Sequence, residues 1–336
     1  DDVFWCTSDI GWVVGHSYIV YAPLVAGATT VFREGAIDHP NPGVFYEVIE
    51  KYGVNVMFTA PTLLRMLMRY GEEYAQKYDL RSLRFLTCAG EPLNPEALKW
   101  TYEFICGNGE WGHIVDNWWQ TETGGPCLGT PATLPVRPGR VGVAMPGASL
   151  DIVDREGQPI TEPDKGGFLV ITKPFPHFYR TVFGDPERYA KDWNTIPGVY
   201  LTGDVALRDD DGYYMVVGRA DDVLNVAGHR IGSAEVESAL VSHSAVAEAA
   251  VIGKPDELRG EVIKAFVTLR MGQEGSDEMI AALKLHVREQ LGPIAVPAEL
   301  EFMPTLPKTR SGKIMRRLLK ANELGLDPGD ITTLEE

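Results

Sequence analysis

The sequence has few cysteines, no long apolar run and a deficit of positive charge. Its cysteines match neither a disulfide framework nor the paired Cys-x-x-Cys pattern of metal sites; they are Cys6, Cys88, Cys106 and Cys127. The sequence contains no run of 18 apolar residues, so no membrane-spanning helix is predicted. The first residues also lack a basic segment followed by an apolar core, the pattern of a secretory signal. These absences predict a cytoplasmic protein with ordinary buried thiols.

The balance of charge excludes two classes of partner. The chain of 336 residues carries 31 Lys and Arg against 47 Asp and Glu, a formal net charge of −16. Nucleic acids and anionic membranes would repel so acidic a protein at long range, so neither is an expected partner. Against this background the segment LPKTRSGKIMRR, residues 306–317, is strongly basic. We therefore expect this segment to have a local anionic target.

The pattern of apolar, polar and turn-forming residues changes twice along the chain. From residue 1 to 136, short apolar runs alternate with helical patterns, which predicts a parallel sheet covered by helices. Residues 137–219 contain short alternating strands separated by Gly, Pro and Asp turns, which is typical of an antiparallel β-barrel or sandwich segment. Residues 223–336 resemble a compact α+β domain in size and pattern. The predicted fold class is α/β plus a β-barrel segment, followed by a small mobile α+β domain.

Elements of the last domain can be predicted individually. Ser233 is a plausible N-cap for a helix over 234–241, and strands are expected near 245–252 and 261–269. A second helix is predicted over 278–291. Its core-facing stripe would consist of Ile280, Leu283, Val287 and Leu291.

Two short segments have the residue types of a ligand site. DNWWQTETGG, residues 116–125, follows an apolar strand, where the loops of parallel sheets form binding sites. Its adjacent tryptophans should point in opposite directions, so that one can stack on an aromatic ligand and the other can wall a pocket. Glu122 is a candidate ligand for a hard cation. The alternatives are two core tryptophans and a solvated carboxylate.

The second segment is YLTGDVA, residues 200–206, followed by GRADD and NVAGHRIG. Asp204 could accept hydrogen bonds from a ribose diol, and Arg219 and Arg230 could contact anionic groups. Each feature alone is weak, because Gly-Asp turns are common and arginines usually extend over the surface. Their combination with the first segment makes a nucleotide site plausible.

Four motifs in this order, WWQTETGG, YLTGD, GRADDVLNVAGHRIG and LPKTRSGK, resemble the acyl- and aryl-CoA synthetase superfamily of adenylate-forming enzymes. The likeness runs from SDIGWVVGHSY to SGKIMRR, and the double tryptophan resembles the short-chain acyl branch. The resemblance implies an AMP-forming ligase that uses ATP, Mg²⁺ and coenzyme A. Such enzymes convert a carboxylate to an acyl-adenylate with release of pyrophosphate, and the CoA thiol then displaces AMP.

The resemblance also implies roles for individual residues. Lys313 would be the catalytic cation that bridges carboxylate and α-phosphate, and Asp221, within residues 220–222, would be the hinge of the small domain. The implied ATP and AMP site consists of Gly90, Glu91, Pro92, Asp116, Asn117, Trp118, Trp119, Gln120, Thr121, Asp204, Arg219 and Arg230. The acyl pocket would be lined by Val13, Ala89 and Trp119.

Coenzyme A and cation sites are implied in the same way. The residues matched to the CoA site are Val14, Ala227, Gly228 and Arg288. Glu122 would lie by Mg²⁺, and Val241, His243 and Val246 resemble a second cation site; a plain surface histidine is the alternative for His243. Acetylation of Lys313 would remove its charge, so a lysine acetyltransferase and deacetylase are implied partners beside the small-molecule substrates.

Three positions depart from the acetate-specific pattern: Ala89 replaces a valine, Val14 a threonine and Ala227 a serine. The space opened at Ala89 predicts acetate or propionate as preferred acids and leaves branched C4 acids open, while Trp119 should exclude long ones. The Ser/Thr/Gly-rich phosphate loop of the superfamily is absent, so we expect this to be the carboxy-terminal half of a larger enzyme, inactive alone. An aryl-CoA ligase, a peptide-synthetase adenylation domain and a non-catalytic nucleotide-binding fragment are the alternatives.

Overall fold

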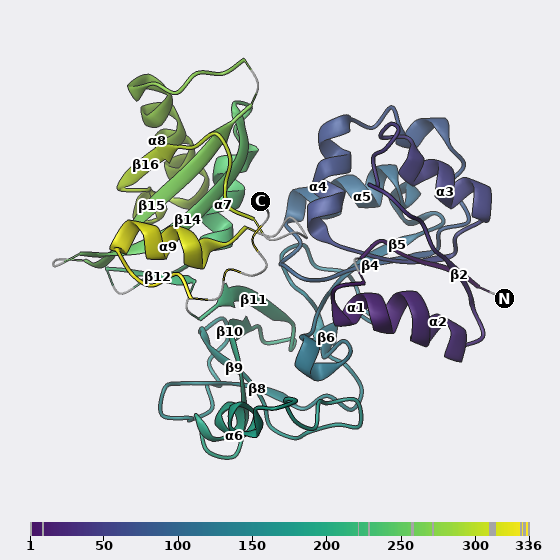
Figure 1. Cartoon of the computed structure of the whole chain (residues 1–336), viewed down its shortest axis with the longest axis horizontal. Helices are drawn as coiled ribbons and strands as arrows, with labels where there is room; N and C mark the ends of the chain where they lie inside the picture. Colours follow the sequence, from purple (N-terminus) through teal and green to yellow (C-terminus); the bar gives the residue numbers. More distant parts are fainter. Residues whose placement is uncertain are drawn as a thin grey trace. The chain divides into compact units, whose positions relative to one another are not determined.

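The computed structural model describes residues 2–8, 10–220, 222–227, 229–256, 259–270, 272–308, 314–329, 331 and 334. The chain divides into two compact units (Figure 1). The first unit comprises Asp1–Thr202 and Ala206–Val216, and the second comprises Gly203–Val205 and Val217–Glu336. Each unit has its own hydrophobic core.

A seven-stranded sheet forms the centre of the first unit. Its strands are, in spatial order, β2 (Thr29–Val31), β1 (Val3–Cys6), β3 (Val56–Thr59), β4 (Phe85–Cys88), β5 (His113–Trp118), β6 (Leu128–Gly129) and β7 (Val143–Ala144). The first five strands pair in parallel, and β6 and β7 continue the sheet antiparallel. The predicted parallel α/β arrangement is therefore confirmed.

Helices cover both faces of this sheet (Figure 1). On one face lie α3 (Val44–Tyr52), α4 (Pro61–Tyr70) and α5 (Pro95–Phe104). Pro61 starts α4 at a position where the missing N–H has no helical partner to lose. Gly53 ends α3 with a φ of 59°, in the left-handed region that favours glycine. The strands and these helices enclose the main core, which includes Trp5, Phe45, Ile49, Leu86 and Ile114.

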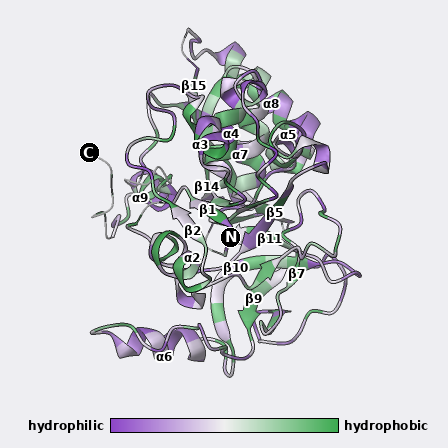
Figure 2. Cartoon of the chain, turned by 90° about the vertical axis from the view of Figure 1, so that its right-hand side faces the viewer, coloured by the Kyte–Doolittle hydropathy of each residue, from purple (hydrophilic) through white to green (hydrophobic). Residues whose placement is uncertain are grey.

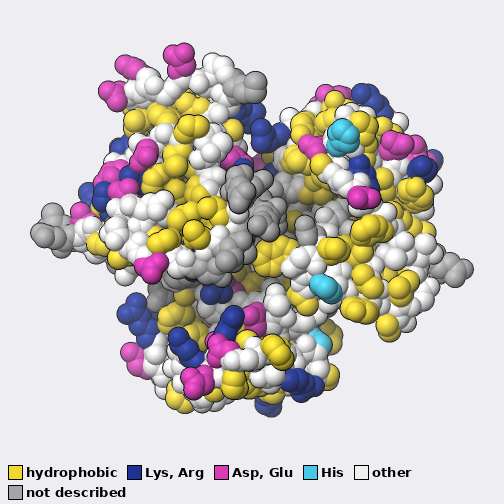
Figure 3. All heavy atoms as spheres, in the orientation of Figure 1, with side chains coloured by type: hydrophobic (Ala, Val, Ile, Leu, Met, Phe, Trp, Pro, Cys, Tyr) yellow, Lys and Arg dark blue, Asp and Glu magenta, His cyan; other side chains and the backbone are white. Residues whose placement is uncertain are grey.

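A continuous helical segment covers the opposite face. It consists of α1 (Val13–Gly15), the π-helical turn η1 (His16–Tyr21) and α2 (Ala22–Val25). Ile19 is buried against the sheet, whereas Tyr21, Leu24 and Val25 are 65%, 59% and 88% exposed. Hydrophobic side chains accordingly gather on the surface over α1 and α2 (Figure 3). The segment therefore buries only one of its apolar faces in this unit.

A second sheet has the order β11 (Tyr214–Arg219), β10 (Tyr200–Arg208), β9 (Gly167–Ile171), β8 (Leu150–Val153). β8 and β9 pair antiparallel, as predicted, and the linear order makes the arrangement an open sheet instead of a closed barrel. A tight turn connects β10 and β11, where Asp209 N–H donates to the Tyr213 carbonyl at 3.0 Å. Helix α6 (Pro186–Asn194) is hydrophilic and has no fully buried residue (Figure 2).

The second unit is an α+β structure, as predicted. Its sheet has the order β13-β12-β15-β14, with β16 beside β15. The elements are β12 (Val223–Val226), β13 (His229–Gly232), α7 (Ser233–Ser242), β14 (Val246–Asp256), β15 (Gly260–Leu269), α8 (Asp277–Leu291), β16 (Glu299–Phe302) and α9 (Arg316–Leu324). Short 3₁₀ turns complete the chain; they are η2 (Ala75–Lys77), η3 (Gly107–Gly109), η4 (Thr121–Thr123) and η5 (Pro293–Ala295).

Two local predictions for this unit were wrong. Gly232, not Ser233, is the N-cap of α7, because the strand β13 ends there and the helix begins directly at Ser233. In α8, Leu283 and Val287 are fully buried, but Leu291 is 41% exposed. Leu291 is the last residue of the helix, where the chain turns away from the core.

Two simple expectations can be compared with the fold. The four cysteines are free and buried, as predicted. Over the described residues, none of the helices combines the length and apolar character that a membrane crossing requires.

Candidate functional site

The loops that follow β4 and β5 meet at the carboxyl edge of the parallel sheet. Cys88 and Asp116 are paired in register at the ends of these strands. The Asp116 carboxylate accepts a hydrogen bond from Leu93 N–H at 3.1 Å, across the loop that follows β4. Asp116 is thus turned toward protein groups, and it supports the loop that contains Gly90, Glu91 and Pro92.

Burial makes Asp116 a weaker acid than an ordinary aspartate. Asp116 is only 8% exposed. Burial raises the pKa of Asp116 from its ordinary 3.8 to about 7, while the hydrogen bond from Leu93 opposes the rise. Near neutral pH the folded protein therefore holds a proton on Asp116 that the unfolded chain has already released.

This proton predicts a pH-dependent stability. Since the folded state binds the extra proton between the two pKa values, 3.8 and about 7, the free energy of unfolding should fall as pH rises through that interval. The contribution of this one group is at most about 1.4 kcal/mol per pH unit. The side chain at position 116 of the Asp116→Asn variant cannot ionise, so the free energy of unfolding of this variant should not fall with pH in this way. At pH 8 it should therefore exceed that of wild type. Chemical denaturation of both proteins at pH 4 to 8 measures it.

The matched control for Asp116→Asn is Asp210→Asn, which removes an exposed carboxylate from the turn between β10 and β11. It should leave the pH profile of stability nearly unchanged. A constant difference between wild type and Asp116→Asn from pH 4 to pH 7 would contradict the assignment.

Asn117 has an unused hydrogen-bond acceptor. Its side-chain nitrogen donates to the Thr87 hydroxyl in the neighbouring strand. Its oxygen Oδ1 is buried and, among the described residues, has no hydrogen-bond partner. Buried polar atoms are nearly always paired, so a lone acceptor at a strand end suits a donor supplied by a ligand. An exocyclic amine is one such donor.

The two adjacent tryptophans pack in different clusters, in agreement with their predicted opposite directions. Trp118 lies against the cluster that contains Leu128 and Val141. Trp119 lies in a cluster with Ala89 and Val14. Both tryptophans are half-buried. Stacking of Trp118 on an adenine stays a prediction.

Trp119 forms a wall of aromatic rings. Its ring lies edge-on to Tyr18, with centroids 5.7 Å apart, and to Phe58, with centroids 6.2 Å apart. Ala89, the first residue after β4, is 7% exposed in the same cluster. The structure thus brings Ala89, Trp119 and Val14 together, while Val13 is half-buried in α1 and is absent from that cluster. The apolar environment suits a small alkyl group.

The residues after Trp119 connect the loop to the neighbouring sheet. Gln120 donates from Nε2 to the Thr202 carbonyl at 2.8 Å. Thr121 is exposed at the start of η4. The Glu122 carboxylate lies 3.7 Å from the Arg188 guanidinium of α6. Gln120 therefore holds this loop to the second sheet. Glu122 supplies the carboxylate of the loop, which is partly exposed and could contact a ligand.

The loop after β4 is held by a second set of contacts. Gly90 has a φ of 107°, and an added Cβ there would meet nothing within 4 Å. Glu91 accepts from Arg65 at 2.8 Å and also from the Thr62 hydroxyl. Open space beside a glycine with positive φ leaves its backbone accessible to a ligand. Arg65 and Thr62 were not predicted from the sequence, because they lie in a helix with no motif of its own.

Asp204 and Arg219 lie together in the second unit, with the carboxylate and guanidinium 3.8 Å apart. The Asp204 residue is 6% exposed on β10. Gly203 beside it has a φ of 75°, and an added Cβ would lie 2.5 Å from the Arg219 guanidinium. Any side chain at position 203 would therefore displace Arg219. The predicted pairing of these two residues near one ligand agrees with their proximity.

Three predicted residues, Asp221, Gly228 and Lys313, lie outside the described residues. The backbone of Arg230 in β13 pairs with Asn225 in β12, and the side chain of Arg230 lies outside the described residues. Ala227 has a φ of 51°, a left-handed conformation that costs a non-glycine residue about 1 kcal/mol or more. Arg288 is exposed in the last turn of α8, as its expected role requires.

The predicted second cation site has competing contacts. His243 caps the C-terminus of α7, and its Nδ1 accepts from Ala245 N–H at 3.2 Å. Burial lowers the pKa of His243, and His286 lowers it further. The Val246 carbonyl already accepts from the Arg270 guanidinium at 3.0 Å, while Val241 packs in the core. A cation at Val246 would have to share that carbonyl with a positive charge, so these residues fit a cation poorly in this arrangement.

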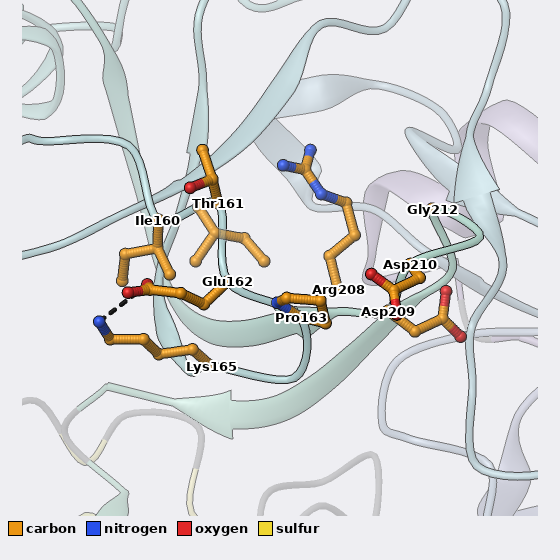
Figure 4. A pocket seen from close by; sticks show the side chains of 10 residues that line it. Ile160, Thr161, Glu162, Pro163, Lys165, Arg208, Asp209, Asp210 and Gly212 are labelled. Carbon is orange, nitrogen blue, oxygen red and sulfur yellow. Dashed lines mark hydrogen bonds and ion pairs between the residues drawn. The ribbon is translucent and has the colours of Figure 1, made fainter.

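Side chains supply no other metal site in the part of the chain that the structure describes. Within the described ranges, no three His, Cys, Asp or Glu side chains are grouped so that they could hold a metal ion. A hollow of about 360 Å³ lies beside the second sheet, where Glu162 and Lys165 pair at 2.8 Å (Figure 4). None of the residues predicted for the nucleotide, acyl or CoA sites lines this hollow.

Comparison with known families decides the classification. A family profile described as AMP-binding enzyme matches residues 1–177, and one described as AMP-binding enzyme C-terminal domain matches residues 235–313. The chain belongs to the AMP-binding enzyme family. This membership confirms the resemblance seen in the motifs.

Curated relatives in the family are named acetyl-coenzyme A synthetase. The protein of Pyrobaculum aerophilum is 52% identical over 340 residues, covering 100% of this chain and 50% of its own length. That of Chlorobaculum tepidum is 48% identical over 342 residues, covering 100% of this chain and 51% of its own length. The chain thus spans about half the length of the curated relatives it matches.

Solved structures in the family share the fold. The anthranilate CoA ligase AuaEII in complex with anthranoyl-AMP is 28% identical, with a TM-score of 0.80 over 96% of this chain and 60% of the ligase chain. A Brucella canis acyl-CoA synthetase is 39% identical, with a TM-score of 0.59 over 97% of this chain and 58% of its own. Both neighbours are CoA ligases by name, which agrees with the expected fold class.

Proposed function

We propose that the full-length polypeptide containing this chain is an AMP-forming short-chain acyl-CoA synthetase. It would convert a short carboxylate, ATP and coenzyme A to acyl-CoA, AMP and pyrophosphate, with acetate or propionate preferred. The observation that carries the proposal is the junction of the loops after β4 and β5. There a small apolar wall, containing Ala89 and Trp119, adjoins the end of β5, where the buried Oδ1 of Asn117 has no hydrogen-bond partner among the described residues.

The first half-reaction joins two anions. A carboxylate oxygen attacks the α-phosphorus of ATP, the bond to the bridging oxygen of pyrophosphate breaks, and its electron pair leaves with pyrophosphate. Positive charge must lie between the attacking and leaving groups to lower this barrier. Lys313 is the residue we assign to this role, with Arg230 at a phosphate. Asp204 and Arg219 would hold the ribose.

The nucleotide base would lie against the two loops of the first unit. Asn117 Oδ1 would accept from the base, and Gly90, Glu91 and Pro92 would border it. Asp116 would act on the nucleotide site indirectly, because its carboxylate accepts a hydrogen bond from Leu93 N–H within that loop. Gln120 likewise acts by holding the loop to Thr202.

A divalent cation fits Glu122 better than the residues around His243. Glu122 supplies a hard carboxylate oxygen, and Arg188, 3.7 Å away, is its present counter-charge. Mg²⁺ bound there would neutralise phosphate charge in the adenylation step. Arg188 was not predicted from the sequence, because it lies far from Glu122 in the chain. Only the folding of α6 against this loop brings the two side chains together.

The second half-reaction uses different residues. The CoA thiol loses its proton to solvent, its sulfur attacks the acyl carbonyl carbon, and the bond to AMP breaks with the electron pair leaving on the phosphate oxygen. We propose that rotation about Asp221 exchanges Lys313 for the residues matched to the CoA site, Ala227 and Gly228. Val14 would border the pantetheine arm, and Arg288 would contact the 3′-phosphate of CoA.

A panel of acids tests the proposal in the full-length enzyme. Values of kcat/KM for acetate, propionate, isobutyrate and octanoate should favour acetate or propionate, because each methylene changes binding in an apolar pocket by only ~1–3 kcal/mol but Trp119 closes the far wall. Isobutyrate as best substrate would favour the branched C4 alternative. Octanoate as best substrate would overturn the short-chain assignment.

The alternative of a non-catalytic nucleotide-binding fragment is not favoured, because the relatives that match the whole chain at 48–52% identity are named acetyl-coenzyme A synthetase. We propose that the chain alone does not adenylate acids, because it has no Ser/Thr/Gly-rich phosphate loop. ATP–pyrophosphate exchange by the isolated chain would contradict this, and absence of exchange by the full-length protein would favour the non-catalytic reading. The cytoplasm as location, and a lysine acetyltransferase and deacetylase acting on Lys313, belong to the same proposal.

A further inference from the structure

The two ends of the segment that contains Lys313 are held against each other. Residues 309–313 lie outside the description, but the residues on either side are described. Lys308 and Ile314 form an antiparallel bridge. Met315 N–H donates to the Pro307 carbonyl at 2.8 Å. The described residues on the two sides of this segment are therefore adjacent.

The downstream end is held by an ion pair between a half-buried arginine and a buried glutamate. Arg316, the first residue of α9, donates from Nε to Oε1 of Glu237 in α7 at 2.6 Å. Its Nη2 donates to the second oxygen, which makes the contact bidentate. Glu237 is 8% exposed and also accepts from Val251 N–H at 2.9 Å. Such a carboxylate holds a guanidinium in a defined orientation.

The upstream end has a weaker contact. Lys308 Nζ lies 2.6 Å from the Glu248 carboxylate in β14, and the two side chains are 26% and 32% exposed. The Arg316–Glu237 contact is bidentate and less exposed, with side chains 20% and 10% exposed, so it holds its geometry better than the single Lys308–Glu248 contact. Of the two ends, the one next to Lys313 is thus the better fixed.

The far end of α9 is also restrained. Glu323 accepts from Lys254 at 2.9 Å and from Lys264 at 2.6 Å, and these lysines lie in β14 and β15. Leu319, between the two ends, is buried. Helix α9 is thus bound to α7 through Arg316 at its start and to the sheet through Glu323 at its end. The position from which residue 313 extends is therefore set by this helix.

We propose that Glu237 is a positioning residue for Lys313, acting through Arg316. The inference rests on the proposed function, in which Lys313 serves only the adenylation step. Correct placement of a catalytic group accounts for a large share of a rate, and a displacement of about 1 Å can cost on the order of 100-fold. Loss of the Glu237 charge should therefore impair adenylation selectively.

Glu237→Gln in the full-length enzyme tests the inference. We expect acyl-adenylate formation, measured by ATP–pyrophosphate exchange, to fall about 10- to 100-fold. Thioester formation from synthetic acyl-AMP and CoA should stay within about twofold of wild type, since that step is assigned to other residues. Glu274→Gln, at an exposed loop position, is the matched control and should change neither rate.

Two further variants make the result decisive. Arg316→Gln added to Glu237→Gln should lower exchange little further, because both substitutions remove the same contact. Glu237→Asp keeps the charge and is used if the glutamine variant does not fold; it should give a smaller loss in the same step. Equal losses in both half-reactions would overturn the inference, since they indicate general destabilisation.

Failure of the inference is distinguishable from failure of the proposed function. If Lys313→Ala abolishes exchange while Glu237→Gln leaves it unchanged, Glu237 has no positioning role and the function stands. If Lys313→Ala leaves exchange unchanged, the proposed function itself is wrong. Limited proteolysis by trypsin gives a readout independent of activity: faster cleavage at the basic residues of 308–317 is expected in Glu237→Gln, and an unchanged rate would contradict the inference.

Discussion

Replacing Lys313 with alanine in the full-length enzyme is expected to lower acyl-adenylate formation by at least about 100-fold. The reaction brings a carboxylate toward a triphosphate, and removal of one preorganised cationic donor leaves the developing charge uncompensated. Loss of a single such donor in other enzymes costs about 10²–10³ in rate. Acid-dependent pyrophosphate release measures the effect.

The thioester half-reaction is the internal control for Lys313→Ala. Synthetic acyl-AMP and CoA should react at nearly the wild-type rate, because Lys313 has no assigned part in that step. Lys320→Ala, which removes a half-buried lysine from α9, is the matched control and should leave both steps nearly unchanged. Full pyrophosphate release by Lys313→Ala would remove the basis of the proposed mechanism.

Replacing Trp119 with glycine is expected to turn the enzyme toward longer acids. The indole packs edge-on to Tyr18 and Phe58 and closes the apolar cluster that contains Ala89. Its removal opens space for several methylene groups, each worth ~1–3 kcal/mol in an apolar pocket. We expect kcat/KM for octanoate to rise at least about 100-fold and that for acetate to fall about 10-fold.

Trp119→Phe keeps an aromatic wall and should retain the preference for short acids. Loss of a fully buried tryptophan side chain typically costs about 3–5 kcal/mol, and Trp119 is half-buried, so thermal unfolding must show that the glycine variant is folded at the assay temperature. A folded Trp119→Gly enzyme that still rejects octanoate would show that another side chain limits the length of the acid.

Much of the fold could be predicted from local pattern. Alternating apolar runs and helical stretches predicted the parallel sheet, and the Gly, Pro and Asp turns of 137–219 predicted the change to antiparallel pairing at β8 and β9. The stripe in α8 was correct at Leu283 and Val287, which lie in the middle of the helix, and wrong at Leu291. Periodicity reports the face of a helix, but it does not report where the core ends.

The candidate site was predicted only in part. The motifs placed Ala89 and Trp119 after strands, and the register of β4 with β5 accounts for their proximity. Asp116 was expected to contact the nucleotide, but its carboxylate accepts a hydrogen bond from the Leu93 N–H of the same unit. Arg188 beside Glu122 had no signal in the sequence, because no local pattern specifies which exposed arginine of α6 faces a loop on another element.

The sequence alone determined the order of strands and helices, the position of the basic segment 306–317, and the family to which the motifs point. These properties depend on residue type and spacing, which are local. Tertiary structure alone decided the raised pKa of Asp116, the pairing of Gln120 with Thr202, and the bond between Glu237 and Arg316. Each of these depends on which distant segments become neighbours, and only packing of the elements determines that.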